Sequence, residues 1–210
     1  MQVRVFELPP IGTNAYLLSD SNRKEAVLID TPQSAWQTIA PILEKEGLDL
    51  KAALLTHGHF DHTLGGEDFN RNGIPMYGHK ADAALFSDVG AQLTRFGLPH
   101  LRCVLQIDHW VSEGQSIELL GRTCQIRHVP GHCPGNVLFY FPEEGKAFVG
   151  DALFAGGIGR TDLEGGDYDT LMDSIRNRIY SLPNDTEVYP GHGTTTTVGI
   201  EKQSNPFVRA

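Results

Sequence analysis

The sequence predicts a mixed α/β fold of four layers, in which two packed β-sheets carry helices on their outer sides. Strand-like and helix-like patterns alternate along the whole chain, and they form two β-rich halves that are each interleaved with helices. No short-period repeat, linker or low-complexity stretch interrupts this order. The chain has 210 residues, 40% of them apolar, so we expect residues 1–210 to form a single domain.

The first half of the chain begins with three strand-like runs. Residues 3–8 alternate apolar and polar side chains, residues 15–18 are mostly apolar, and residues 26–29 form a short run of aliphatic residues. A helical pattern then starts at Ser34, and Gly47 is placed as its stop. The continuous apolar run 52–55 predicts a strand that is buried on both faces.

The remaining elements follow in the same mixed order. Residues 99–110 have no clear period, and residues 156–159 form a glycine-rich loop. The expected helices are 66–72, 81–93, 167–182 and a terminal helix from Val198, and the expected strands are 76–78, 116–120, 124–129, 137–141, 147–149 and 187–189.

Charge and cysteine content exclude several classes of protein. The formal net charge of −9 argues against nonspecific binding to nucleic acid or to an anionic membrane, because such contacts need clustered Lys and Arg. Cys103, Cys124 and Cys133 are an odd number without C-x-x-C spacing, which indicates neither a disulfide framework nor a cysteine zinc site. No stretch approaches the roughly 18 apolar residues of a membrane span, and residues 1–10 lack a signal-peptide pattern. We therefore expect a cytoplasmic protein.

The strongest functional signal follows the run 52–55. His57, His59, Asp61 and His62 place four potential metal ligands within six residues, and Gly58 relieves crowding between the first two. Imidazole and carboxylate groups suit zinc, with iron and manganese as alternatives. This loop could serve two adjacent metal ions.

Three more potential ligands stand at turns just beyond predicted strands. They are His132 after Pro-Gly, Asp151 after Gly150, and His192 after Pro-Gly. Loops at strand ends are where scaffolds usually place chemistry, and the preceding glycines permit unusual turns. Taken singly these could be ordinary turn residues, but together with the cluster they indicate one metal centre.

The pattern His57-x-His59-x-Asp61-His62, with His132, Asp151 and His192 following in order, resembles the HxHxDH signature and downstream ligands of the metallo-β-lactamase superfamily. The resemblance spans nearly the whole chain and implies the four-layer αβ/βα sandwich of that family. It also implies one metal ion held by His57, His59 and His132, a second held by Asp61, His62 and His192, and Asp151 bridging both. Flavodiiron-type relatives typically have Glu where this chain has His59, which favours hydrolysis.

Two such ions, with zinc preferred, would hold a hydroxide that attacks an acyl carbonyl, and Asp61 would help to orient it. The run from Gly150 to Asp162 resembles glyoxalase II-like proteins and persulfide dioxygenases. We therefore expect a hydrolase for S-lactoylglutathione or a related small, anionic acyl thiol. The sequence does not predict an oligomeric state.

Two basic residues are candidates for binding that substrate. Arg160 matches the place where glyoxalase II enzymes hold the glycine carboxylate of glutathione, although it could instead pair with Asp162 or Asp167. Lys202 could offer a second positive charge, and a solvated helix face is its alternative role. The chain ends at Ala210, without the C-terminal helical domain of larger glyoxalase II enzymes, and the requirement for glutathione is therefore left open.

Other functions remain in competition at this stage. A mononuclear-iron persulfide dioxygenase would use His57, His132 and Asp151 as ligands, and a lactonase or β-lactamase would use the same metals as the thiolester hydrolase. A non-enzymatic metal-binding module is the least specific alternative. Cys133 is expected to be a small buried residue, and His79, His100, His109 and His128 are expected to be surface, loop or packing residues.

Overall fold

The computed structural model describes residues 1–95, 97 and 103–209, and its chain divides into two compact units. The first unit is Met1–Trp110 and the second is Val111–Ala210. Each unit is a β-sheet with helices, in agreement with the predicted mixture of strands and helices. The expectations for residues 99–102, including His100, lie outside the described residues.

The first unit contains a six-stranded sheet in which the strands follow their order in the chain. The first three strands are antiparallel, and the fourth and fifth continue the sheet in parallel with the third. The strands are β1 (Gln2–Leu8), β2 (Thr13–Asp20), β3 (Glu25–Ile29), β4 (Asp49–Leu54), β5 (Met76–His79) and β6 (His109–Val111). Because β3 and β4 are parallel, the loops that follow them leave the same edge of the sheet.

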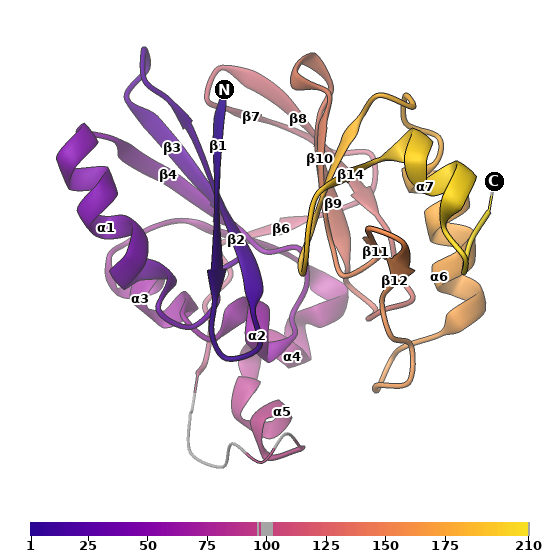
Figure 1. Ribbon diagram of the computed structural model, residues 1–210. Coiled ribbons are helices and arrows are strands. Elements are labelled where there is room, and N and C mark those ends of the chain that lie inside the picture. Colours follow the sequence, from indigo (N-terminus) through magenta and orange to yellow (C-terminus); the bar gives the residue numbers. More distant parts are fainter. Residues whose placement is uncertain (96, 98–102, 210) are drawn as a thin grey trace. The chain divides into compact units, whose positions relative to one another are not determined.

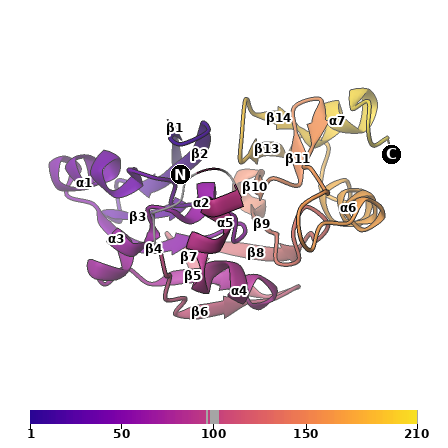
Figure 2. The same cartoon turned by 90° about the horizontal axis from the view of Figure 1, so that it is seen from below.

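Two helices, α1 (Ala35–Glu46) and α3 (Gly66–Arg71), lie beside this sheet in both Figure 1 and Figure 2. Ile39 of α1 and Phe69 of α3 are fully buried in one apolar cluster with residues of β2, β3 and β4. The helix predicted to begin at Ser34 and stop at Gly47 is confirmed, and Gly47 has the left-handed backbone of a helix terminator.

The prediction of one helix over residues 81–93 is wrong. The chain instead forms a 3₁₀ turn η1 (Lys80–Asp82) and two short helices, α4 (Ala83–Ser87) and α5 (Val89–Arg95). Asp88 separates the helices, and its side chain accepts a hydrogen bond from the backbone N–H of Ala91. A local side-chain bond of this kind competes with helical pairing, which explains the break.

The second unit contains another six-stranded sheet, of order β14-β13-β10-β9-β8-β7. Only the β10–β13 pair is parallel among the described pairs of this sheet. The strands are β7 (Ser116–Leu119), β8 (Arg122–His128), β9 (Val137–Phe141), β10 (Lys146–Gly150), β13 (Glu187–Pro190) and β14 (Thr196–Thr197), with a 3₁₀ turn η2 (Pro142–Glu144) between β9 and β10.

Helices α6 (Tyr168–Ser174) and α7 (Val198–Ser204) lie on one side of this second sheet in Figure 1. The predicted helix 167–182 begins as α6, with Asp167 as its N-cap, and continues as a π-helical stretch η3 (Ile175–Ile179). Leu171, Ile175 and Val198 are buried against apolar residues of β9, β10 and β13. The predicted glycine-rich loop contains part of a small hairpin, β11 (Leu153–Phe154) and β12 (Gly157–Ile158).

A further short helix, α2 (Phe60–Thr63), lies within the histidine cluster of the first unit.

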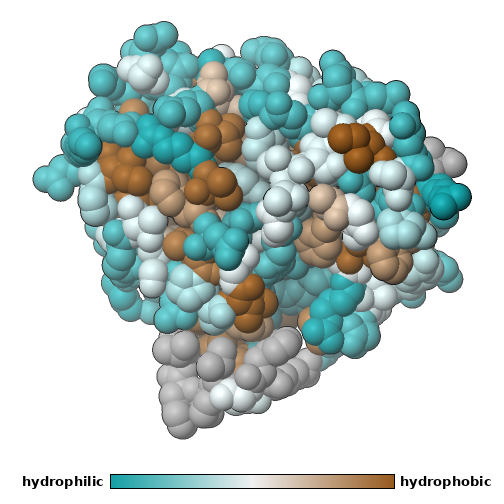
Figure 3. Space-filling view, viewed as in Figure 1, coloured by the Kyte–Doolittle hydropathy of each residue, from teal (hydrophilic) through white to brown (hydrophobic). Residues whose placement is uncertain are grey.

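None of the helices in the described part of the chain has the length and apolar character needed to span a bilayer. On the face drawn in Figure 3, apolar residues form separate patches among polar ones.

Candidate metal centre

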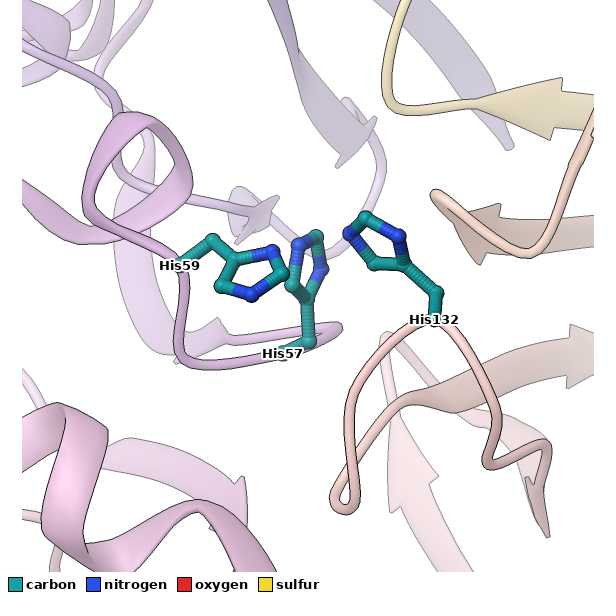
Figure 4. A group of neighbouring side chains, drawn as sticks. All are labelled: His57, His59 and His132. Atoms are coloured by element: carbon teal, nitrogen blue, oxygen red, sulfur yellow. The ribbon is translucent and has the colours of Figure 1, made fainter. Parts of the chain in front are cut away.

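The first unit gathers four of the predicted ligands in the loop after β4 and in α2. His57, His59, Asp61 and His62 are all buried. The ring centroid of His57 lies 4.8 Å from that of His59 and 4.1 Å from that of His62. Figure 4 shows the rings of His57 and His59 side by side above their loop. This set is the first half-site.

Asp30, which directly follows β3, organises the first half-site although the sequence analysis did not select it. Its carboxylate accepts hydrogen bonds from the Thr56 N–H at 2.7 Å and the Thr56 hydroxyl at 2.8 Å, and it contacts His62 Nδ1 at 2.8 Å. Because an ionised carboxylate only accepts hydrogen bonds, His62 carries its proton on Nδ1. The Nε2 atom of His62 is therefore the one with a lone pair for a metal.

The same reasoning assigns the proton on His57. Its Nδ1 lies 3.1 Å from the Thr56 hydroxyl oxygen. The hydroxyl proton is already donated to Asp30, so the oxygen accepts from His57 Nδ1. His57 and His62 thus both present Nε2 as the ligand atom.

The carboxylate of Asp61 is fixed by Thr13, a residue of β2. The Thr13 hydroxyl donates to Asp61 Oδ2 at 2.7 Å, and both residues are buried. Asp61 Oδ2 lies 3.3 Å from His62 Nε2. Two ligand atoms at about 2.0–2.1 Å from one tetrahedral ion lie roughly 3.4 Å apart, so this spacing suits a shared metal.

The second unit gathers the other three predicted ligands, which follow β8, β10 and β13 and form the second half-site. Asp151 Oδ2 lies 3.7 Å from His132 Nε2 and 3.5 Å from His192 Nε2. Asp151 and His132 are buried, and His192 is partly exposed. These distances also fit ligands placed around metal ions.

Figure 4 shows His132 on a loop of the second unit, and a backbone carbonyl orients its ring. Its Nδ1 lies 2.7 Å from the Arg160 carbonyl oxygen, which can only accept, so His132 also presents Nε2. Gly131 has a φ of +126°, and a Cβ there would lie 2.3 Å from the backbone nitrogen of Leu171. Only glycine fits this turn, which places His132 at the end of its loop.

The two predicted substrate-binding residues have other partners in this structure. Arg160 forms two hydrogen bonds of 2.7 Å with Asp162, which was the alternative expected from the sequence. This pairing lowers the pKa of Asp162 to about 2. Lys202 donates to the side chain of Asn184 at 2.8 Å. The substrate-binding roles of both residues stay predictions.

Three of the four histidines outside the ligand pattern are described. His79 accepts a hydrogen bond from Ala81 N–H, His109 stacks on Tyr77, and His128 Nε2 contacts the Pro134 carbonyl. Cys133 is buried, as expected. These contacts agree with packing and loop roles.

The sequence of the chain matches a known protein family. Residues 8–192, a range that includes all seven predicted ligands, match the model of the Metallo-beta-lactamase superfamily. The chain belongs to this superfamily. The predicted fold class is confirmed, and the chain is a metallo-hydrolase of the superfamily with a metal-binding His/Asp set.

Two curated relatives cover most of the chain. It is 40% identical to "Hydroxyacylglutathione hydrolase GloC" of Haemophilus influenzae over 213 residues, which is 100% of this chain and 99% of that protein. It is 33% identical to "Persulfide dioxygenase ETHE1, mitochondrial" of Bos taurus over 213 residues, 97% of this chain and 74% of that protein.

Two solved structures are similar over nearly the full length. BLEG-1 B3 metallo-beta-lactamase has a TM-score of 0.91 and 37% identity, with both chains covered completely. TTHA1623 in a di-iron-bound form has a TM-score of 0.86 and 38% identity, covering 98% of this chain and 100% of the other.

Proposed function

We propose that this protein hydrolyses a thiolester, S-lactoylglutathione or a related small acyl thiol, with two divalent cations. The full-length similarity to a hydroxyacylglutathione hydrolase carries this proposal. The seven buried or partly buried ligand residues support it, because such a set is suited to holding ions that activate water.

We assign the ligands as the family resemblance implies. His57, His59 and His132 would hold one ion, Asp61, His62 and His192 the other, and Asp151 both. The donor chemistry supports this assignment: three of the histidines have their Nδ1 proton committed to a fixed oxygen, which is the usual arrangement around metal-binding histidines.

When bound, the two cations would polarise the acyl carbonyl and lower the pKa of water toward neutrality. In the reaction, the oxygen of water bonds to the acyl carbon, the carbon–sulfur bond breaks, and the products are a carboxylic acid and a free thiol. Thr13 fixes the carboxylate of Asp61, which would both ligate and orient the attacking water.

Arg160 and Lys202 are proposed to attract the anionic end of the substrate. Arg160 and Asp162 are 52% and 68% exposed, so water screens the attraction between them and the ion pair is weak. A substrate carboxylate can therefore replace Asp162 as the partner of Arg160 at little cost. For Lys202 the competing partner is a neutral amide, Asn184.

We propose zinc as the metal because imidazole and carboxylate ligands suit it, and iron is the main competitor because a similar structure is described as di-iron-bound. The test is a metal-quantified activity panel on protein grown without metal supplements. We expect two ions per chain and hydrolysis of S-lactoylglutathione or another acyl thiol, exceeding that of lactones and β-lactams. Two ions without any acyl-thiol turnover would contradict the proposal. The cytoplasmic location stays a prediction.

A persulfide dioxygenase is the second candidate, since the ETHE1 relative aligns with 97% of the chain. Its iron would be held by His57, His132 and Asp151. The same panel separates the two functions: one iron per chain with oxygen uptake dependent on glutathione persulfide would favour the dioxygenase.

A further inference from the structure

The backbone on both sides of His59 is held by one side chain from helix α5. Gln92 donates from Nε2 to the Gly58 carbonyl at 3.0 Å, and its Oε1 accepts from the Phe60 N–H at 3.1 Å. Gly58 and Phe60 are the two chain neighbours of His59. Gln92 therefore fixes the backbone immediately before and immediately after His59.

The contacts of Gln92 allow only one orientation of its amide. A backbone carbonyl accepts and a backbone N–H donates, so nitrogen must face Gly58 and oxygen must face Phe60. The nitrogen also lies 3.3 Å from the Leu85 carbonyl in α4. Gln92 is thus itself anchored to the neighbouring helix, which makes it a defined support.

Asp82 fixes the second backbone polar group of Gly58, its N–H. Its fully buried carboxylate accepts the Gly58 N–H at 2.8 Å. A Cβ on Gly58 would lie 2.7 Å from Leu85 Cβ and 3.0 Å from Asp82 Cβ, so the segment of η1 and α4 packs directly on the loop. Both backbone polar groups of Gly58 are therefore fixed by side chains.

This support differs from those of the other ligands in the first half-site. Thr56, Thr13 and Asp30 contact the side chains of His57, Asp61 and His62, respectively. Gln92 and Asp82 instead fix the backbone from which the His59 ring projects. Because an imidazole is rigid beyond its two side-chain torsions, the position of its backbone sets where its nitrogens can reach.

We propose that Gln92 and Asp82 are positioning residues for His59. Their hydrogen bonds to Gly58 and Phe60, together called the clamp, determine whether the protein retains the metal ion that His59 ligates. The proposal rests on the proposed function, in which His59 is a ligand of the two-ion hydrolase. His59 is not among the three ligands of the one-iron dioxygenase. The clamp would therefore position the additional ligand that separates this metal site from the three-ligand iron site of the dioxygenase.

The test compares Gln92→Met with Gln37→Met. Methionine has nearly the size and helix propensity of glutamine but makes neither hydrogen bond. Gln37 is the matched control because it is also a helical glutamine whose amide donates a hydrogen bond, in this case to the Asp68 side chain, but it lies exposed on α1. Zinc affinity and stoichiometry are measured by competition with a chromophoric chelator, together with acyl-thiol turnover.

We expect Gln92→Met to bind one of its two zinc ions about 10–100-fold more weakly, as is typical for loss of a partner that orients a ligand. The other zinc ion should be held as in the wild type, and turnover should fall with the lost ion. Gln37→Met should match the wild type. Unchanged affinity for both ions, or equal weakening of both, would overturn the proposal.

A metal-independent measurement guards against misfolding and against failure of the proposed function. In metal-free protein, hydrogen exchange at the Phe60 amide should be faster in Gln92→Met than in the wild type or Gln37→Met, and an unchanged rate would overturn the clamp. If Gln92→Met does not fold, Gln92→Glu keeps the acceptor for Phe60 but removes the donor to Gly58, and it should still weaken one zinc ion. Wild-type protein with one metal and no acyl-thiol turnover would refute the proposed function, while the exchange rates would still test the clamp.

Discussion

At the scale of single residues, the candidate centre depends on where protons are held as much as on where ligands stand. His57, His62 and His132 each donate a hydrogen bond from Nδ1. The acceptors are a hydroxyl, a carboxylate and a backbone carbonyl oxygen, respectively. In each case the oxygen must accept, so Nε2 is left with its lone pair. Removing one of these acceptors should therefore impair metal binding without removing any ligand.

Asp30→Asn tests this argument. With the amide oxygen kept on the Thr56 N–H, the new NH₂ group would face the Thr56 hydroxyl and His62 Nδ1, where an acceptor is required. His62 would then favour the tautomer with its proton on Nε2. We expect zinc affinity and kcat/KM to fall about 10–100-fold, measured by chelator competition and steady-state kinetics.

The control for this prediction is Asp49→Asn, a charge-equivalent change at an exposed carboxylate that pairs with Lys51. This control should leave zinc affinity unchanged. Wild-type zinc affinity in Asp30→Asn would show that the acceptor on His62 Nδ1 is not needed.

The sequence predicted ligands better than it predicted their supports. The ligands carry a recognisable spacing, whereas Asp30 and Thr13 are single polar residues that become neighbours of the cluster only through the pairing of β2, β3 and β4. Asp30 did have a signal: it follows an apolar run, as the cluster follows the next strand-like run. The contacts of Gln92 involve a helix that starts after the break at Asp88, which the helical pattern did not predict.

At the scale of elements, ligands stand where predicted strands end. The strands before His57, His132, Asp151 and His192 were all predicted because each has a continuous or alternating apolar pattern. The strands β6, β11, β12 and β14 have only two or three residues each, too few for any periodicity to be recognised. Their formation depends on pairing partners that are not visible in the local sequence.

The short hairpin of β11 and β12 links the terminal helix to His132. Buried Glu201 of α7 accepts the Gly156 N–H at 3.0 Å, and Asn205 donates to the Gly157 carbonyl at 3.1 Å. Beyond β12 the chain reaches Arg160, whose carbonyl accepts from His132. The helix thus supports the backbone that orients a predicted ligand.

Glu201→Gln should weaken this link. The Glu201 carboxylate accepts from the Thr196 hydroxyl at Oε1 and from Gly156 and Asn205 at Oε2, so an amide would keep its oxygen on Gly156 and Asn205 and turn its NH₂ group to the Thr196 hydroxyl. We expect the free energy of unfolding to fall by about 1–2 kcal/mol in urea titrations, because hydrogen bonds to a carboxylate are stronger than hydrogen bonds to an amide oxygen. Zinc affinity should fall as well.

Gln203→Glu is the matched control, because it makes the opposite change at an exposed position of the same helix. It should alter neither unfolding nor zinc affinity. A Glu201→Gln protein that loses stability but keeps wild-type zinc affinity would separate α7 from the orientation of His132.

At the scale of the whole molecule, the family could be predicted because its seven ligands are spread over both halves of the chain and match in order. The substrate could not be predicted in the same way. Arg160 and Lys202 are polar residues with protein partners, and their pairing with Asp162 and Asn184 is equally compatible with structural and binding roles. Substrate choice therefore has to be decided by the activity panel.

The stability of the molecule should fall at alkaline pH. Burial raises the pKa of the Cys103 thiol and of the Tyr180 hydroxyl to about 12, from ordinary values of 9.0 and 10.0, and it also raises the pKa of Cys124. The unfolded chain releases these protons above about pH 9, whereas the folded chain keeps them until its raised pKa values are reached. In this range the folded chain holds more protons than the unfolded chain. The free energy of unfolding therefore decreases as pH rises from about 9 toward 12.

This prediction is measured as the Tm of metal-free protein between pH 8 and 10.5. One proton of difference costs about 1.4 kcal/mol per pH unit, or roughly 3–5 °C in Tm for a chain of this length. In the Cys103→Ala, Cys124→Ala double variant the decrease should be shallower, because the unfolded chain then has two fewer thiols to ionise near pH 9. An equally steep decrease in this variant would show that other groups cause the alkaline unfolding.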